Sequence, residues 1–245
     1  MKINLYSDSS SLGFVELVDS LGSDGLTAVN AARASYGKES LELTKRDKNL
    51  LKYCMAEGHT SIFEHNAITF RFKVPLFVAR QHMRHRTWSF NEISRRYTSV
   101  DLDFYTPSNF RTQHESNHQA SIANSQINPA LYTTDGEYEE HTCFADEALR
   151  NHIDSSVFLY NKMIESGIAR EQARMVLPQN LYTTYWGTVN LNNLIKFINL
   201  RDHAGAQIEI QEMAKACRTI ATSLWPETMK LYNENNILIN LSSNS

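Results

Sequence analysis

The chain has 245 residues, enough for one large domain or two small ones with a substantial buried core. Its hydrophobic content of 42% and charged content of 21% are typical of a soluble globular protein. A formal net charge of -3 argues against a general nucleic-acid-binding protein, and no stretch approaches the roughly eighteen apolar residues of a membrane span. Three widely spaced cysteines and a polar N-terminus without a secretory signal favour the cytoplasm, and no cysteine pair has metal-site spacing.

The first part of the chain predicts short elements of both kinds. Alternating apolar residues predict a strand over residues 2–6, whereas residues 14–18 fit either a strand or the start of a helix. The alanine-rich residues 26–36 are predicted to be helical. A second helix is predicted between Thr44, its N-cap, and Gly58, its C-terminal stop.

The segment from His59 to His65 contains two histidines and Glu64, and three interpretations of it remain open. Its spacing matches no known zinc motif and no cysteine is nearby, which argues against a metal site. A capped turn with one buried histidine is the ordinary structural interpretation. A polar loop at a ligand site is the third, because loops on a rigid scaffold commonly carry function.

The clearest strand covers residues 67–74, in which apolar side chains alternate with polar ones. A strand with one apolar face indicates an antiparallel sheet. Pro75 then suits the first turn of a helix, which is predicted to run towards His85.

The densest charged stretch, residues 84–97, follows this apolar segment and contains four arginines, a histidine, a glutamate, an asparagine and two serines. The dipole at a helix C-terminus favours cations and so explains Arg84 and Arg86 without a ligand. It does not explain the polar residues beyond them, and a cationic cluster next to core is costly unless an anion meets it. We therefore expect an anion-binding site here, with a solvated helix end as the alternative.

Residues 108–142 are polar with little periodicity, and they predict a long loop or an inserted lid within a single domain spanning residues 1–245. Helical spacing returns at Ala145 and ends at Gly167. A short helix is predicted before Pro178. The remaining predicted elements are a strand over residues 180–189, helices over residues 191–200 and 206–224, and a last helix after Pro226.

Three arginine sites lie far apart in the sequence, namely residues 84–97, Arg174 and Arg201, and each falls at or next to a predicted helix end. Arginine matches phosphate oxygens with two parallel hydrogen bonds, so a ligand with one or more phosphates explains all three sites. The sequence contains no phosphate-binding glycine loop, so side chains would recognise the phosphate. Neither Ser89 nor Ser94 lies in a nucleophile-elbow sequence, and the cysteines are interpreted as packing residues.

The run Arg84-His85-Arg86, then seven residues, then Ser94 resembles the signature of the flavin-dependent thymidylate synthases. The likeness extends in the family's order over about residues 50 to 215. The segments that carry it are residues 58–65, 77–81, 89–97, 173–178, 199–201 and 206–210. An ordered set of this kind is far more specific than one signature.

The resemblance implies conversion of dUMP to dTMP, with methylenetetrahydrofolate as one-carbon donor and NADPH-reduced FAD as hydride source. It also implies an α+β fold, an antiparallel sheet flanked by helices, assembled as a homotetramer whose active sites combine several subunits. The cysteine-dependent synthase attacks the uracil ring with a thiol, and no cysteine lies near the arginine cluster in this sequence. Catalysis would therefore depend on positioning and on electrostatic polarisation of the pyrimidine.

Roles for single residues also follow from the resemblance. The dUMP phosphate and sugar would be held by Gln81, Arg84, Glu92, Ser94, Arg95, Arg96 and Arg174. Arg201 would contact the uracil edge and favour its ionised form. FAD would be contacted by His59, Ser61, Arg84, His85, Arg86, Glu92, Asn190, Asn192 and Lys196. Arg201 and Ser94 are the catalytic candidates, and for Ser94 we expect ligand binding beside Arg96 rather than nucleophilic attack.

Four positions depart from the family pattern. Arg95 stands where many relatives have a small residue, and Gly205 replaces a histidine. Asn192 and Lys196 stand where arginine and asparagine are expected.

Two rival functions stay open: a folate- and FAD-dependent RNA methyltransferase, against which the negative charge argues, and a non-catalytic nucleotide-binding regulator. The expected partners are therefore small molecules and further copies of this chain, without a nucleic-acid polymer or a membrane.

Overall fold

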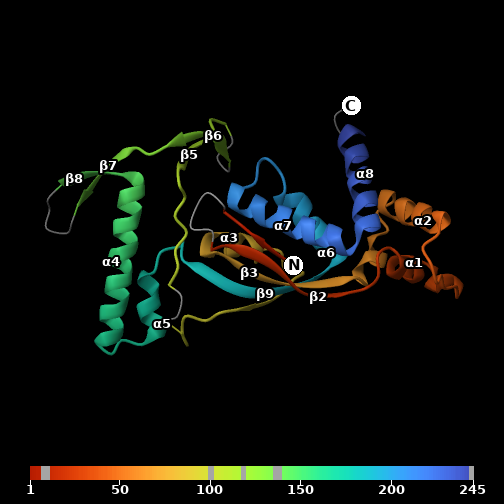
Figure 1. Ribbon diagram of the computed structural model, residues 1–245, viewed down its shortest axis with the longest axis horizontal. Helices are drawn as coiled ribbons and strands as arrows, with labels where there is room; N and C mark the ends of the chain where they lie inside the picture. The colour runs from red at the N-terminus through yellow and green to blue at the C-terminus, as the bar shows by residue number, and fades with distance from the viewer. Residues whose placement is uncertain (7–11, 99–101, 117–119, 135–139, 243–245) are drawn as a thin grey trace.

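The computed structural model describes residues 1–6, 12–98, 102–116, 120–134 and 140–242 (Figure 1). At its centre lies a five-stranded antiparallel sheet in the order β1-β2-β3-β9-β4. Its strands are β1 (Lys2–Asn4), β2 (Phe14–Leu21), β3 (Ala67–Pro75), β4 (Ser89–Glu92) and β9 (Tyr182–Asn190). The predicted mixture of helices with an antiparallel sheet is confirmed, and residues 14–18 belong to a strand.

Strand β3 lies in the middle of the sheet because it is apolar on one face along its whole length. Its side chains alternate between buried and half-buried positions, as the sequence predicts. On the neighbouring strand β9, Gly187 pairs with Phe70. A Cβ atom at Gly187 would come within 3.0 Å of the Phe72 ring and 3.2 Å of the Trp88 ring. Glycine at this position therefore lets both rings pack directly against the backbone of β9.

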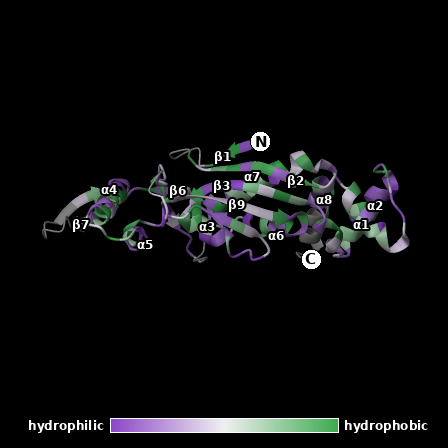
Figure 2. Ribbon diagram, turned by 90° about the horizontal axis from the view of Figure 1, so that it is seen from below, coloured by the Kyte–Doolittle hydropathy of each residue, from purple (hydrophilic) through white to green (hydrophobic). Residues whose placement is uncertain are grey.

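Three helices cover one face of the sheet, namely α3 (Leu76–His82), α6 (Leu191–Arg201) and α7 (Ile208–Leu224) (Figure 1). Figure 2 shows hydrophobic and hydrophilic residues mixed along the strands and helices, as expected for elements with one buried side. Helix α3 ends at His82 rather than continuing to His85, so residues 84–86 follow the helix in a turn. The arginine cluster thus leaves the end of α3 and enters strand β4.

Another group of helices gathers at one end of the sheet: α1 (Leu26–Arg33), the 3-10 turn η1 (Ala34–Tyr36), α2 (Lys45–Ala56), the 3-10 turn η2 (Thr60–Glu64) and α8 (Pro226–Ser242). Thr44 is the N-cap of α2 and forms a capping box with Asp47, as its side chain accepts from the Asp47 N–H. Gly58 follows α2 with a φ of 70°, which glycine adopts without strain. Both predicted boundaries of α2 are confirmed.

The interpretation of residues 59–65 as a turn with one buried histidine is wrong. Both His59 and His65 are exposed, and the buried histidine of this region is His82 on α3. Within the described ranges, no group of three or more His, Cys, Asp and Glu side chains could hold a metal ion. In that same part of the chain, no helix is long and apolar enough to cross a membrane.

The described part of residues 108–142 contains two antiparallel strand pairs in place of the expected long loop. Their strands are β5 (Phe110–Gln113), β6 (Ser121–Ile127), β7 (Ala130–Thr134) and β8 (Glu140–Phe144). These strands are short and mostly exposed, so they lack the apolar alternation that a strand prediction needs. They continue into α4 (Ala145–Glu165), α5 (Arg170–Ala173) and η3 (Arg174–Val176), at the opposite end from α1 and α2 (Figure 1).

Candidate active site

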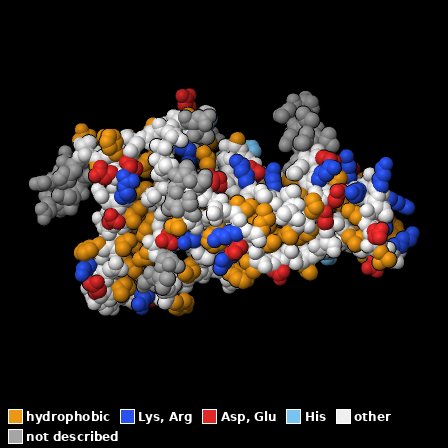
Figure 3. Space-filling view, viewed as in Figure 1, with side chains coloured by type: hydrophobic (Ala, Val, Ile, Leu, Met, Phe, Trp, Pro, Cys, Tyr) orange, Lys and Arg blue, Asp and Glu red, His pale blue; other side chains and the backbone are white. Residues whose placement is uncertain are grey.

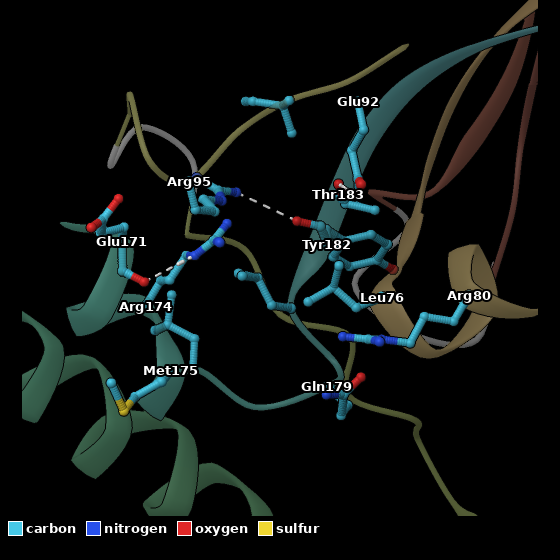
Figure 4. A pocket seen from close by; sticks show the side chains of 13 residues that line it. Leu76, Arg80, Glu92, Arg95, Glu171, Arg174, Met175, Gln179, Tyr182 and Thr183 are labelled. Carbon is cyan, nitrogen blue, oxygen red and sulfur yellow. Dashed lines mark hydrogen bonds between the residues drawn. The ribbon is translucent and has the colours of Figure 1, made fainter. Parts of the chain in front are cut away.

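A cavity of about 490 Å³ lies where strands β4 and β9, helix α3 and the α5–η3 segment meet (Figure 4). Clefts of this size hold small-molecule ligands. Side chains from three separate stretches of the sequence form its walls: Leu76, Arg80, Glu92, Ile93, Arg95, Glu171, Arg174, Met175, Leu177, Gln179, Leu181, Tyr182 and Thr183.

Two arginines of the cavity reach the same space from different elements (Figure 4). Arg95 follows β4, whose exit is fixed because the Ile93 N–H donates to the Thr184 carbonyl at 2.9 Å. Its guanidinium donates to the Tyr182 carbonyl at 3.4 Å. Arg174 begins η3 and donates through Nε to the Glu171 carbonyl at 3.3 Å. Both contacts are to neutral backbone oxygens, which do not neutralise the positive charge of a guanidinium.

Arginines outnumber carboxylates around the cavity. Arg80 reaches it from α3, and its side chain extends towards Gln179 in Figure 4. Of the two lining carboxylates, Glu92 accepts a hydrogen bond of 2.5 Å from the Thr183 hydroxyl, and Glu171 is exposed. An excess of guanidinium groups with planar donor geometry favours a phosphate or carboxylate ligand.

The cavity brings together three of the residues expected to bind dUMP, namely Glu92, Arg95 and Arg174. Arg96 adjoins it, because its Nε lies 3.8 Å from a carboxylate oxygen of Glu171. Ser94 is half-buried, and its Oγ accepts from the Arg96 N–H at 3.3 Å. The arginine cluster after β4 therefore lines or flanks a single cavity.

The other residues expected at dUMP lie in a second group, where the end of α3 meets α6 and α7. Gln81 donates to the Gln207 side-chain oxygen at 2.5 Å. Arg201 ends α6 and donates through Nε to His85 Nε2 at 3.2 Å. Arg84 is exposed beside them. Among the described residues that line the cavity, none belongs to this group.

The contact between His85 and Arg201 sets the protonation of the histidine. Burial, with a further contribution from the Arg201 charge, lowers the pKa of His85 from its ordinary 6.5 to about 4. His85 is therefore neutral at physiological pH, and its Nε2 carries the lone pair that accepts from Arg201. The His85 ring is also held edge-on to Phe197, with centroids 5.0 Å apart. A rigid neutral ring thus orients the guanidinium of Arg201.

Five of the residues expected at FAD lie around η2 and on or next to α6, two elements that contact each other, whereas Arg84, His85 and Arg86 follow α3 and Glu92 is on β4. His59 and Ser61 are exposed at η2, and Lys196 is exposed on α6. Asn192 is buried and donates to the Glu64 carboxylate at 2.9 Å. Asn190 is the N-cap of α6 and accepts from the Asn193 N–H at 2.9 Å. The two asparagines thus have structural partners of their own.

The sequence did not identify four of the polar lining residues, namely Arg80, Glu171, Gln179 and Thr183. A signal existed only for Arg80, which lies four residues before Arg84 and so faces the same side of a helix. The others are brought to the cavity by the pairing of β9 with β4 and by the turn after η3, which depend on tertiary structure.

The fold and cavity define a class of protein, an α+β protein with an arginine-lined site for an anionic, nucleotide-sized ligand. Residues 16–227 match the sequence model of the family described as thymidylate synthase complementing protein. The flavin-dependent thymidylate synthase of Thermosipho melanesiensis is 40% identical over 220 residues, covering 90% of each chain. The flavin-dependent thymidylate synthase of Thermus thermophilus is 40% identical over 223 residues, covering 91% of this chain and 76% of that protein.

Solved structures agree with the sequence comparison. The UMP/dUMP methylase PolB from Streptomyces cacaoi, bound with 5-Br dUMP, superposes with a TM-score of 0.76 at 32% identity, covering 95% of this chain and 97% of that chain. The same methylase bound with 5-Br UMP gives a TM-score of 0.71 at 33% identity. This chain belongs to the flavin-dependent thymidylate synthase family.

Proposed function

We propose that this enzyme methylates dUMP to dTMP, taking the carbon from methylenetetrahydrofolate and the hydride from FAD that NADPH has reduced. The observation that carries the proposal is the cavity in which Arg80, Arg95 and Arg174 converge. A nucleoside monophosphate offers the dianionic group that these guanidinium groups match. The relatives named flavin-dependent thymidylate synthases supply the type of reaction.

In the proposed site, Arg95 and Arg174 hold the phosphate while Arg201 polarises the uracil. A fixed cation beside the ring carbonyl stabilises negative charge as it develops there, and it does so without reorganisation. His85 acts through Arg201, because its neutral Nε2 accepts from the guanidinium and leaves the terminal nitrogens for the ligand. Ser94 is assigned to ligand binding, since its hydroxyl pairs with the backbone of Arg96 rather than with a general base in the described part of the chain.

The residues proposed at FAD fit an anionic cofactor. Arg84 and Arg86 are exposed, and neither is within 4.0 Å of a carboxylate among the described residues. Two such arginines suit a pyrophosphate, with His59, Ser61, Asn190, Asn192 and Lys196 completing the proposed contact surface. When bound, the flavin supplies the hydride that completes the methyl group.

We also propose that the enzyme is a homotetramer whose sites are completed across subunits. Arg174 lines the cavity and Arg201 does not, although both are assigned to the same substrate. Large apolar side chains are exposed beside the cavity, with Met175 69% and Phe158 65% accessible in the single chain. Exposed apolar surface of this kind marks a contact surface for another chain.

The relationship to PolB favours a second candidate substrate, because that protein is named a methylase of UMP as well as dUMP. The two nucleotides differ only in the 2′-hydroxyl of the sugar. UMP methylation is therefore tested alongside dUMP methylation. Methylation of RNA and nucleotide binding without catalysis are the two rival functions that the same assays distinguish.

The test combines a spectrum with an assay. The purified enzyme should bind FAD, and it should form dTMP from dUMP only when NADPH and methylenetetrahydrofolate are both present.

Arg174→Ala should raise the KM for dUMP about tenfold or more, since one charge-assisted hydrogen bond contributes about 1.5–3 kcal/mol. Arg170→Ala, one turn earlier and outside the described lining of the cavity, is the matched control. Arg201→Ala should lower turnover far more than flavin content.

Four results would refute the proposal in different ways. A protein that takes up no FAD excludes the whole family reaction for this chain. Turnover on UMP but not dUMP reassigns the substrate, and methylation of RNA alone reassigns the class. Unchanged dTMP formation by Arg201→Ala removes that residue from the mechanism.

A further inference from the structure

A second cavity, of about 530 Å³, lies between α1–η1 and the start of α2. It is at the opposite end of the molecule from α5 and the candidate active site (Figure 1). Figure 3 shows lysine and arginine side chains at the edge of this end of the molecule. The cavity is lined by Ala32, Arg33, Tyr36, Lys38, Arg46 and Leu50, none of which has been assigned to dUMP or FAD.

One wall of this cavity is rigid. The Arg33 guanidinium forms an ion pair with Asp47 and a hydrogen bond with the Ser40 hydroxyl. Asp47 is fully buried, and it also accepts from the Thr44 N–H at 2.9 Å in the capping box of α2. Arg33 therefore holds α1 and α2 together, and its side chain serves as a fixed wall.

Two further cationic side chains line the cavity without a carboxylate partner of the kind that Arg33 has, within the described residues. Lys38 and Arg46 are both exposed, and neither lies within 4.0 Å of a carboxylate in the part of the chain that the structure describes. Arg46 is in the first turn of α2, where the helix dipole adds positive potential. Two cations on a preformed wall favour a ligand with a doubly charged group such as a phosphate.

An exposed aromatic ring stands beside these cations. Tyr36 lines the cavity with 77% of its surface accessible, and Gly37 with a φ of 60° turns the chain after it. Ala32 and Leu50 supply apolar surface between the two helices. A ring face next to cations and apolar side chains suits a ligand that joins a planar base to a phosphate, which is a nucleotide.

We propose that this cavity binds the adenosine 2′-phosphate half of NADPH. The inference rests on the proposed function, which requires a reduced nicotinamide dinucleotide in addition to dUMP and FAD. Lys38 and Arg46 would pair with the 2′-phosphate, and Tyr36 would stack on the adenine. Helix α1 also packs against η2, which carries Ser61 and follows His59, so the reductant is held next to the segment assigned to FAD.

The experiment measures binding of NADP⁺ and NAD⁺ to the FAD-loaded enzyme by calorimetry, since the two differ only in the 2′-phosphate. The Lys38→Ala/Arg46→Ala variant should weaken NADP⁺ binding by about tenfold or more and leave NAD⁺ binding unchanged. Tyr36→Ala should weaken both dinucleotides. Lys45→Ala/Lys52→Ala, which removes two lysines of α2 outside the described lining of the cavity, is the control for net charge and should bind both normally.

Unchanged NADP⁺ binding in the double variant would overturn the proposal, and so would equal weakening of NADP⁺ and NAD⁺. A defect confined to folates carrying extra glutamates would also overturn it, and would reassign the cavity to that anionic tail. Binding requires no turnover, so this result is separate from the dTMP assay. Normal NADP⁺ binding by an enzyme that forms no dTMP would refute the proposed function and leave this site standing.

Discussion

At the residue scale, the contact between Arg201 and His85 shows how a neutral histidine can hold a guanidinium in place. A protonated His85 would repel the guanidinium and offer it no lone pair. Burial of the ring and the nearby charge both disfavour the protonated form, so the histidine remains an acceptor. The buried His82 beside it, whose Nδ1 lies 2.9 Å from the Tyr185 hydroxyl, has its pKa lowered by burial as well.

The titration of His85 is directly measurable. In an NMR titration its ring signals should change with a midpoint of about 4 instead of about 6.5. Arg201→Ala should raise this midpoint, because the variant removes a cation and opens the ring to water. A midpoint near 6.5 in the unaltered enzyme would show that the ring is neither buried nor facing Arg201 as described.

The sign of the accompanying stability effect follows from the same shift. The unfolded chain binds a proton at His85 at a higher pH than the folded chain does. Stability from this group is therefore complete above about pH 6.5 and declines as the pH falls towards 4. His85→Gln, which retains a side-chain acceptor but does not titrate, should unfold with less dependence on pH in that window.

At the scale of elements, the boundaries that the sequence predicted are those with a local cause. Helix α2 begins at Thr44 and ends before Gly58 because a capping box and a left-handed glycine act within a few residues. Strand β3 was predictable because one face is apolar throughout. The strand pairs in residues 108–142 were not, since their strands bury little and their pairing alone distinguishes them from loops.

The capping box of α2 has a measurable contribution. Thr44→Ala removes the hydroxyl that donates to Asp47 Oδ2 at 2.6 Å and accepts from the Asp47 N–H. We expect the free energy of unfolding to fall by about 1 kcal/mol, measured by urea denaturation, with Thr44→Ser close to the unaltered enzyme. These hydrogen bonds lower the pKa of Asp47, so the difference should shrink as acid protonates that carboxyl. Equal stability of the alanine and serine variants would contradict this account.

Strand β5 is tied to helix α7 by an ion pair between the half-buried Arg111 and the buried Glu209. Arg111 donates to Glu209 at 2.6 Å, and the Tyr105 hydroxyl donates to the same carboxylate oxygen at 3.1 Å. Arg111→Ala would leave Glu209 buried without its cation, which costs about 3–5 kcal/mol in unfolding experiments. Arg150→Ala removes an exposed pair with Asp146 and should cost far less. Similar losses in both variants would contradict the burial of Glu209.

At the scale of the whole molecule, the central sheet separates two ends that carry different charged surfaces (Figures 1 and 3). One end holds the arginine-lined cavity and the other holds the α1–α2 cavity. The sequence predicted an anion site formed by residues 84–97 and Arg174, and Arg95 and Arg174 do line the first cavity. It could not predict which arginines share a cavity, because β9, α3 and η3 converge only in the folded chain.

The separation of Arg174 from Arg201 leads to a prediction about assembly. We expect the two residues to reach one nucleotide from different chains, so that each single variant impairs every site in its own assembly. Mixing Arg174→Ala with Arg201→Ala and allowing subunits to exchange should create sites that contain both native arginines. At a dUMP concentration below the raised KM of Arg174→Ala, part of the dTMP-forming activity should then return, while each variant treated alone stays impaired.

Sedimentation of the same mixtures provides the control, because exchange requires an assembly larger than the 28.1 kDa chain. Four copies are expected from the proposed homotetramer, and exchange is verified with differently tagged variants. Activity that stays absent in demonstrably mixed assemblies would mean that one chain supplies both arginines. The cavity and the end of α6 would then have to approach each other within a single chain when substrate binds.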